Sequence, residues 1–186
     1  MTAETGHPEE HAAGRPEGGS EERTPRVLAI TVSNRAAAGV YPDRSGPVLV
    51  ELLEKAGCRV DGPVVVPDGE PVLDALRDAV AQGYDAAVTT GGTGLTLTDR
   101  TPEMTRRVIE REVPGIAEAI RLEGRGKVPA AILSRGLAGV AGRTLIVNLP
   151  GSTGGVRDGM AVLGPVLAHA VDQIRGGDHP RPAHGH

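Results

Sequence analysis

The chain has 186 residues, 39% of them hydrophobic, a length that suits one domain with a sizeable core and is too short for two ordinary domains. It contains no Phe, no Trp and only two Tyr, so it lacks the aromatic platforms on which single-stranded nucleic acid stacks. The formal net charge of −4 equals the charge of the first 24 residues, which leaves a neutral body without a basic face. We therefore expect no nucleic-acid partner.

Both ends of the chain have the composition of tails. Residues 1–25 are rich in Gly, Glu, Pro and His and predict a disordered acidic tail, and residues 176–186 predict a flexible His/Pro-rich tail. The domain is then expected at 26–175. Cys58 is the only cysteine, which excludes a disulfide framework and a thiolate metal cluster. The N-terminal residues carry no apolar signal segment and nothing predicts a membrane span, so we expect a cytoplasmic protein without a membrane partner.

Strand and helix patterns alternate along the first half of the domain. Residues 26–33 form an apolar run that is typical of a strand buried on both faces. A helix capped by Ser45 is expected over 45–56, because its apolar residues recur at intervals of three and four. A strand over 60–66, a helix over 72–83 and a strand over 84–90 follow.

The second half continues this alternation. A helix is predicted from an N-cap at Thr101 to about Val113, and a short helix from Pro114 to Leu122. Strands are predicted over 130–133 and 144–147, before a last helix with an apolar stripe over 156–174. The order predicts an α/β fold, a three-layer α/β/α arrangement with a mostly parallel central sheet.

Polar segments follow the apolar runs at four places. These are Ser33-Asn34-Arg35, Pro67-Asp68, the loop 91–101 and the segment 148–152. Parallel sheets bind ligands at the carboxyl ends of their strands, so we expect the site where these segments meet.

The turn Gly91-Gly92-Thr93-Gly94 is a candidate anion site. Glycines let the backbone turn tightly with its N–H groups exposed to a phosphate or carboxylate. The turn matches neither the dinucleotide fingerprint nor the phosphate-binding loop with its lysine, which disfavours a nicotinamide-dependent dehydrogenase. The alternative is a plain strand-to-loop connection.

Asp68 and Asp99 are the leading carboxylates. Two carboxylates at neighbouring strand ends beside an anion-binding turn suggest a Mg²⁺ site. The structural alternatives are that Asp68 forms a turn with the following glycine and that Asp99 supports a helix N-terminus. Asp43, Asp85 and Asp158 are interpreted as structural or solvated residues.

These residues carry a resemblance to a known family. Thr89-Thr90-Gly91-Gly92-Thr93-Gly94, followed by Asp99 and by Thr101-Pro102-Glu103, resembles the signature of the Mog/MoaB family of molybdenum cofactor biosynthesis, which includes the gephyrin and plant Cnx G domains. The resemblance extends over about residues 26 to 175, through the segments 32–33, 41–47, 66–68, 133–135, 138–139 and 148–152.

The resemblance implies a molybdopterin adenylyltransferase with Mg²⁺ as cofactor and ATP and molybdopterin as substrates. It also implies a homo-oligomer, usually a trimer and sometimes a hexamer, and leaves open a partner enzyme that inserts the metal. By matching position, Asp68 and Asp99 are the catalytic and Mg²⁺-holding residues. The positions that match ligand-binding segments are Ser33, Gly91, Gly92, Thr93, Gly94, Thr101, Ser134, Arg135, Asn148, Pro150, Gly151 and Ser152.

Two departures from the family pattern keep an alternative open. Thr98 stands where several adenylyltransferases have a basic residue, although Arg100 follows Asp99. Many members have Pro-Gly-X-Pro where this chain has Pro150-Gly151-Ser152-Thr153, a form that is similar to the MoaB branch. The alternative is a non-catalytic protein of the MoaB branch that binds or carries molybdopterin. The sequence does not distinguish molybdenum from tungsten.

Overall fold

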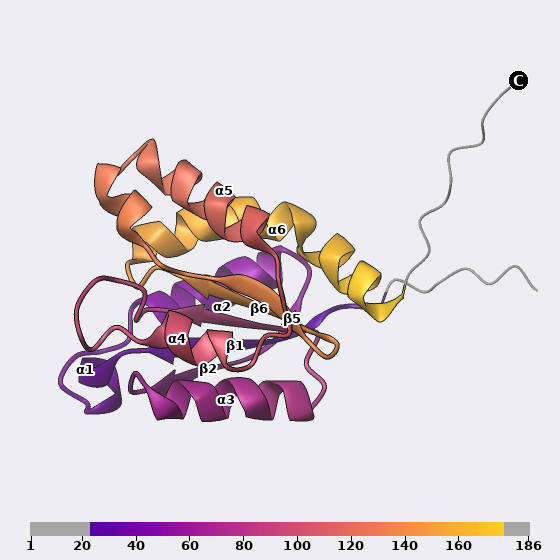
Figure 1. Cartoon of the computed structure of the whole chain (residues 1–186), viewed down its shortest axis with the longest axis horizontal. Helices are drawn as coiled ribbons and strands as arrows, with labels where there is room; N and C mark the ends of the chain where they lie inside the picture. The colour runs from indigo at the N-terminus through magenta and orange to yellow at the C-terminus, as the bar shows by residue number, and fades with distance from the viewer. Residues whose placement is uncertain (1–22, 177–186) are drawn as a thin grey trace, which may run out of the picture.

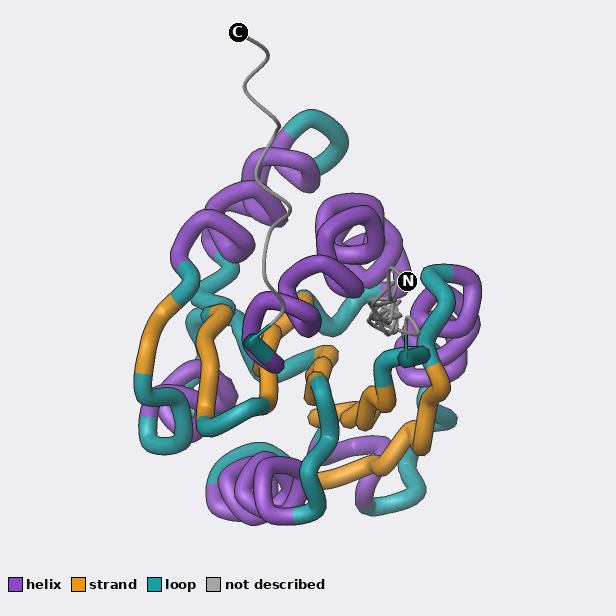
Figure 2. Tube along the Cα trace, turned by 90° about the vertical axis from the view of Figure 1, so that its right-hand side faces the viewer, coloured by secondary structure: helices purple, strands orange, loops and turns teal. Residues whose placement is uncertain are grey.

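A six-stranded sheet runs through the middle of the protein, in the order β2-β1-β3-β6-β5-β4 (Figures 1 and 2). The computed structural model describes residues 23–176, so the tails expected at 1–25 and 176–186 lie almost entirely outside the described residues. The strands β2, β1, β3 and β6 are parallel, whereas β5 and β4 run antiparallel at one edge. The expected mostly parallel sheet is confirmed. The strands are β1 (Arg26–Val32), β2 (Arg59–Val66), β3 (Ala86–Thr90), β4 (Arg111–Glu112), β5 (Ala138–Ala141) and β6 (Thr144–Leu149).

Helices cover both faces of the sheet and complete the three layers. The core on one face joins the sheet to α2 (Ser45–Lys55), α5 (Pro114–Arg125) and α6 (Thr153–Arg175). The core on the other face joins it to α3 (Glu70–Ala81) and α4 (Thr101–Arg106). Two short elements, α1 (Asn34–Ala37) and the 3₁₀ helix η1 (Pro129–Leu133), were not expected. Within residues 23–176, no helix combines the length and apolar character that crossing a membrane requires.

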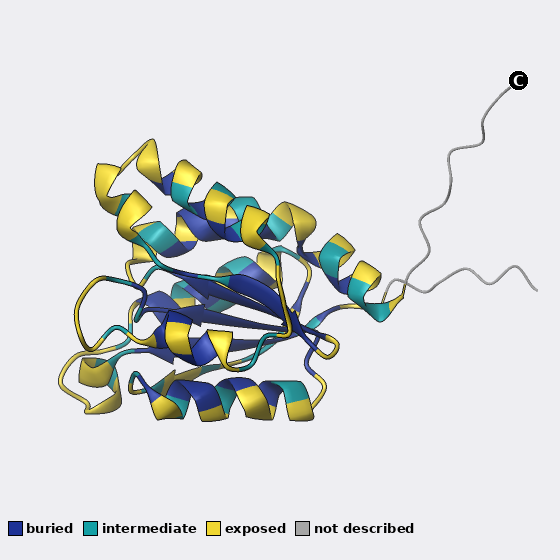
Figure 3. Cartoon of the chain, viewed as in Figure 1, coloured by how far each residue is buried: buried dark blue, intermediate teal, exposed yellow. Residues whose placement is uncertain are grey.

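Alternation along each strand supplies both cores. Val27 and Ala29 pack on the α2 and α6 side, whereas Leu28 and Ile30 pack on the α3 and α4 side, because successive side chains of a strand point to opposite faces. Every residue of β3 and β6 is buried, as Figure 3 shows for the centre of the sheet. The centre of the sheet is therefore fully buried, and polar groups for a site are left to the loops at the strand ends.

The strand expected over 130–133 is wrong. These residues belong to η1, which begins at Pro129 and keeps Ile132 and Leu133 more than half exposed. The strand lies instead at β5, where a side chain at Gly139 would come within 2.7 Å of the Arg111 carbonyl oxygen. Only a glycine allows β4 and β5 to approach so closely, and this pairing cannot be seen in the hydrophobic pattern.

The helix expected from Thr101 to Val113 is too long. It ends at Arg106, after which the Glu110 and Val113 amides each donate to β5 carbonyls at 2.8 Å. The expected N-cap is also wrong, because Arg100 occupies that position without a side-chain cap and Thr101 is the first helical residue. Sheet pairing by β4 thus overrides the local helical preference.

Candidate functional site

The four predicted polar segments meet at one edge of the sheet. The Ser33 amide donates to the Val66 carbonyl at 3.0 Å, which ties the ends of β1 and β2 together. The Gly91 amide donates to the Leu149 carbonyl at 3.1 Å, which ties the ends of β3 and β6 together. The four parallel strands thus deliver their carboxyl ends side by side, where such folds place ligands.

The turn after β3 needs glycine at two successive positions. Gly91 and Gly92 have φ angles of 104° and 65°, which L side chains rarely adopt. A Cβ at Gly92 would also lie 2.2 Å from the Asp68 carboxylate and 2.2 Å from the Thr101 hydroxyl. Backbone, carboxylate and hydroxyl therefore converge at Gly92.

We expect Gly92→Ala to lower the free energy of unfolding by about 2 kcal/mol or more, because left-handed backbone strain adds to this contact. Urea denaturation measures the change. Gly115→Ala is the matched control, since a Cβ there meets nothing within 4 Å. An equally mild effect of both substitutions would contradict the close packing around Gly92.

Asp68 is held at the edge of the loop that follows the glycine turn. Its carboxylate accepts from the Gly69 amide at 2.7 Å, the Arg100 amide at 3.0 Å and the Thr101 hydroxyl at 3.4 Å. Burial raises the pKa of the Asp68 carboxyl, with a smaller contribution from the charge of Asp99, and the two amides oppose this rise. Asp68 forms the turn with Gly69 that the structural alternative expects, and the charge of Asp99 also acts on it.

Asp99 lies on the same loop and faces the glycine turn. Its carboxylate accepts from the Thr96 amide at 3.1 Å and the Thr96 hydroxyl at 2.6 Å. A Cβ at Gly94 would lie 2.8 Å from the same oxygen. The loop therefore holds a carboxylate directly against the backbone of the turn.

Arg135 braces this loop from behind. Its guanidinium donates to the Gly94 carbonyl at 2.8 Å and the Asp99 carbonyl at 2.6 Å, and pairs with Glu103. Its amide donates to the Thr93 carbonyl at 2.9 Å. Arg135 therefore positions the loop, and its side chain is already committed to these contacts.

Three further predicted residues make structural hydrogen bonds. The buried Asn148 amide donates to the hydroxyls of Thr89 and Thr105 at 3.1 and 2.9 Å, and its oxygen accepts from the Leu137 amide. Ser33 caps α1 and Ser152 caps α6 through their hydroxyls. Asn148 thus fixes β6 against the strands beside it, behind the site.

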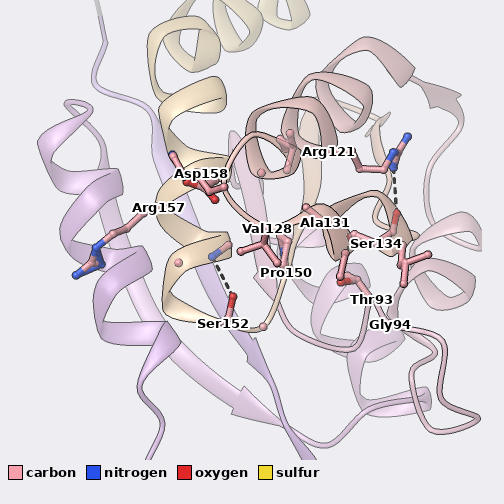
Figure 4. A pocket seen from close by; sticks show the side chains of 18 of the residues that line it. Thr93, Gly94, Arg121, Val128, Ala131, Ser134, Pro150, Ser152, Arg157 and Asp158 are labelled. Carbon is pink, nitrogen blue, oxygen red and sulfur yellow. Dashed lines mark hydrogen bonds and ion pairs between the residues drawn. The ribbon is translucent and has the colours of Figure 1, made fainter.

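A cavity of 890 Å³ opens beside the glycine turn, and Figure 4 shows its lining. A size of this kind suits a small-molecule ligand. The predicted residues that line the cavity are Gly92, Thr93, Gly94, Asp99, Ser134, Pro150, Gly151 and Ser152. Those that are not among its lining residues are Ser33, Asp68, Gly91, Thr101, Arg135 and Asn148.

The far wall of the cavity was missed by the sequence reasoning. It comes from the end of α5, from η1 and from the first turns of α6, with apolar side chains such as Ile120, Val128 and Leu133. More than half of Val128 and of Leu133 is exposed. The only signal in the sequence for this wall is that Val128 and Leu133 lie at or near the segment Leu133-Ser134-Arg135.

Charged side chains also line this far wall. Of the two interpretations of Asp158, structural or solvated, the solvated one is wrong, because Asp158 is 9% exposed and pairs with Lys127. Hydrogen bonds to Asp158 and Glu123 raise the pKa of Lys127. Figure 4 shows the Asp158 side chain directed to the cavity and the Arg157 side chain directed away from it.

The other two minor candidates have structural roles, as expected. Asp43 accepts from the Ser45 and Gly46 amides at 3.1 and 2.9 Å, so it performs the capping of α2 that was assigned to Ser45. Asp85 precedes β3 at the opposite end of the sheet and pairs with Arg175 at 2.5 Å. Neither lines the cavity.

The structure is an α/β fold with a cavity of small-molecule size at the carboxyl edge of its parallel strands. A family profile described as a probable molybdopterin binding domain matches residues 28–169, and the chain belongs to this family.

Individual relatives agree with this assignment. The chain is 35% identical over 161 residues to a molybdopterin adenylyltransferase of Helicobacter pylori, covering 83% of this chain and 90% of the relative. It is 37% identical over 159 residues to a molybdenum cofactor biosynthesis bifunctional protein of Chlorobaculum tepidum, covering 85% of this chain but 51% of the relative, so it spans about half the length of that protein. The structure of a molybdopterin biosynthesis Mog protein from Mycobacterium ulcerans is 50% identical, with a TM-score of 0.78 over 83% of this chain and 99% of that one.

Proposed function

We propose that the protein is a molybdopterin adenylyltransferase, which transfers AMP from ATP to the terminal phosphate of molybdopterin. The observation that carries the proposal is the cavity, which joins the glycine turn and a carboxylate to a largely apolar far wall. The relatives named for this activity support it. A phosphate-bearing pterin needs both parts, because backbone amides hold its anionic end and apolar side chains cover its ring.

The reaction joins two polyanions. An oxygen of the molybdopterin phosphate attacks the α-phosphorus of ATP, the bond from that phosphorus to the bridging oxygen breaks, and pyrophosphate leaves with the bonding electrons. Catalysis of such a transfer consists mainly of positioning and charge neutralisation. The amides of Gly92, Thr93 and Gly94 and the hydroxyl of Ser134, 3.3 Å from that of Thr93, are the groups that would orient the phosphates.

The carboxylates fit a Mg²⁺ ion that arrives with the nucleotide. No group of three or more His, Cys, Asp or Glu residues within 23–176 is arranged to hold a metal ion. Asp68 and Asp99 supply two hard oxygen ligands, and Mg²⁺ bound to phosphates takes one or two carboxylates and fills its remaining positions with phosphate oxygens and water. When bound, the ion supplies positive charge to the phosphates. Asp99 would hold it from the cavity lining and Asp68 from beside that lining, and loop hydrogen bonds fix both carboxylates.

Incubating the purified protein with molybdopterin, Mg²⁺ and ATP tests the proposal. We expect adenylylated molybdopterin and pyrophosphate in equal amounts, separated by chromatography and identified by mass. Molybdopterin that binds tightly without forming product would establish the carrier function instead. Omitting Mg²⁺ in the presence of a chelator should abolish product and leave the fold intact, because the ion comes with the nucleotide.

We also expect a closed homo-oligomer, most simply a trimer. Leu122, Val128, Ile132 and Leu133 are each more than half exposed on neighbouring segments of α5 and η1 and the loop between them, and such apolar side chains suit a subunit contact. Light scattering at micromolar concentration measures the mass. A monomer would contradict the expectation. The mass does not test the expected partner enzyme for metal insertion, which is a separate proposal.

A further inference from the structure

The far end of the cavity holds a carboxylate that the adenylyl transfer does not use. Asp158 lies in the second turn of α6, and its side chain is 12% exposed. In Figure 4 it lies across the cavity from Gly94, which belongs to the glycine turn. A ligand whose phosphate sits at the turn therefore places its other end near Asp158.

The ion pair with Lys127 does not account for the burial of Asp158. The Lys127 side chain is 58% exposed and is shared with Glu123, so it is held at the surface by two acids. A nearly buried carboxylate is costly unless its oxygens are well paired. Each carboxylate oxygen accepts more than one hydrogen bond, so Asp158 retains acceptor capacity toward the cavity.

The surroundings of Asp158 favour a flat ring. Val128 and Pro150 line the cavity between Asp158 and the turn, and Gly124 leaves the end of α5 open beside it. A Cβ at Gly124 would lie 2.8 Å from the Ala131 Cβ and 3.8 Å from the Asp158 carboxylate. The end of α5 thus packs closely on η1 beside Asp158, and the side chains of Val128 and Pro150 give this part of the cavity aliphatic walls.

We propose that Asp158 recognises the 2-amino and N3–H edge of the pterin ring and thereby selects a pterin over other pteridines. The proposal rests on the proposed function, since it assumes that the phosphate end lies at the glycine turn. The pterin edge presents two parallel N–H donors, which match the two oxygens of one carboxylate. A lumazine, which has oxygen in place of the 2-amino group, presents one donor and one acceptor and would place that oxygen against Asp158.

The test compares two fluorescent ligands, a pterin with a phosphate-bearing side chain at C6 and the lumazine with the same side chain. The wild-type protein should bind the pterin about 10- to 100-fold more tightly, the range for hydrogen bonds to a charged group. Asp158→Asn presents one acceptor and one donor, so it should reverse the preference in favour of the lumazine. Equal affinities for the wild-type protein, or an unchanged pterin preference in Asp158→Asn, would overturn the proposal.

Two further variants separate recognition from a structural role. Lys127→Met removes the ion pair but keeps the carboxylate, so it should retain the pterin preference; if it loses the preference as Asp158→Asn does, the ion pair and not the ligand explains Asp158. Asp172→Asn, on the exposed side of the same helix, is the matched control. If circular dichroism shows that Asp158→Asn is unfolded, the wild-type comparison still tests the proposal, because equal affinities for the two ligands would overturn it.

Failure of this inference differs from failure of the proposed function. Adenylylation of molybdopterin by a protein without pterin preference would leave the function intact and remove the role of Asp158. A pterin preference in a protein that forms no adenylylated product would support the role of Asp158 and contradict the proposed function.

Discussion

Asp68→Asn and Asp99→Asn should each reduce the rate of AMP transfer about 100-fold or more, while the protein stays folded. Each substitution keeps the shape of the side chain and one hydrogen-bond acceptor but removes the charge that holds Mg²⁺. Asp99 accepts its two loop hydrogen bonds through one oxygen, so the melting temperature of Asp99→Asn should change by a few degrees at most. Asp68 accepts through both oxygens, so Asp68→Asn loses one acceptor and its melting temperature should fall further. Rates of pyrophosphate release, with the melting temperature, measure both effects.

The structure changes the choice of control. Asp85, interpreted from the sequence as structural or solvated, is buried in an ion pair, so Asp85→Asn is unsuitable as a control. Asp78, exposed on α3, is matched in charge and size, and Asp78→Asn should transfer AMP at the wild-type rate. Near wild-type rates in both loop variants would show that the active site lies elsewhere, and unfolding of both would show that these aspartates are structural.

The second large effect concerns stability and comes from Asp85. Its carboxylate accepts from the Arg26 amide at 2.8 Å and from Arg175 at 2.9 Å, joining the start of β1 and the end of α6 at the start of β3. Asp85→Asn leaves the Arg175 charge without its partner, so we expect the free energy of unfolding to fall by about 3 kcal/mol. For a domain of this size the melting temperature should fall by about 6 to 12 °C. Asp172→Asn, on the helix α6 that carries Arg175, should change the free energy of unfolding little.

The same pair predicts a dependence on pH. Burial raises the pKa of Asp85, but the hydrogen bonds from Arg175 and the Arg26 amide outweigh it and hold the pKa below its ordinary value of 3.8. A lowered pKa in the folded state gives stability that is present above 3.8 and lost as the pH falls through the folded value. The stability difference between wild type and Asp85→Asn should therefore be constant near neutral pH and shrink in strong acid. A difference that grows toward acid would contradict the ion pair.

Elements whose pattern is set by burial could be predicted from the sequence. The apolar run 26–33 is buried in β1, and the apolar stripe over 156–174 faces the core in α6. Their hydrophobic patterns are therefore enough to predict a strand and a helix. The stretch 130–133 looks equally apolar but forms η1 on the surface, because the partner that a strand needs is occupied by β5. Pairing partners lie far away in the sequence, and local pattern does not contain them.

The candidate site divides in the same way. The glycine turn and Asp99 follow directly from the strand before them, and the structure places both at the cavity. Asp158 lies on the side of its helix opposite the apolar stripe, and this position in the sequence is typical of a solvated residue. The end of α5 and Lys127 cover it, and this coverage depends on how two helices pack. Arg135 and Asn148 match the family pattern in position, but their side chains brace the loop and the sheet.

The most direct test of the proposed activity follows labelled phosphorus. ATP labelled at the α-phosphate and ATP labelled at the γ-phosphate are each incubated with the protein, Mg²⁺ and molybdopterin. AMP transfer predicts that the α label appears in the molybdopterin product and the γ label in pyrophosphate, and that both signals fall together in Asp68→Asn and Asp99→Asn. Transfer of the γ label to molybdopterin, or recovery of both labels in unchanged ATP while molybdopterin stays bound, would contradict the proposed function.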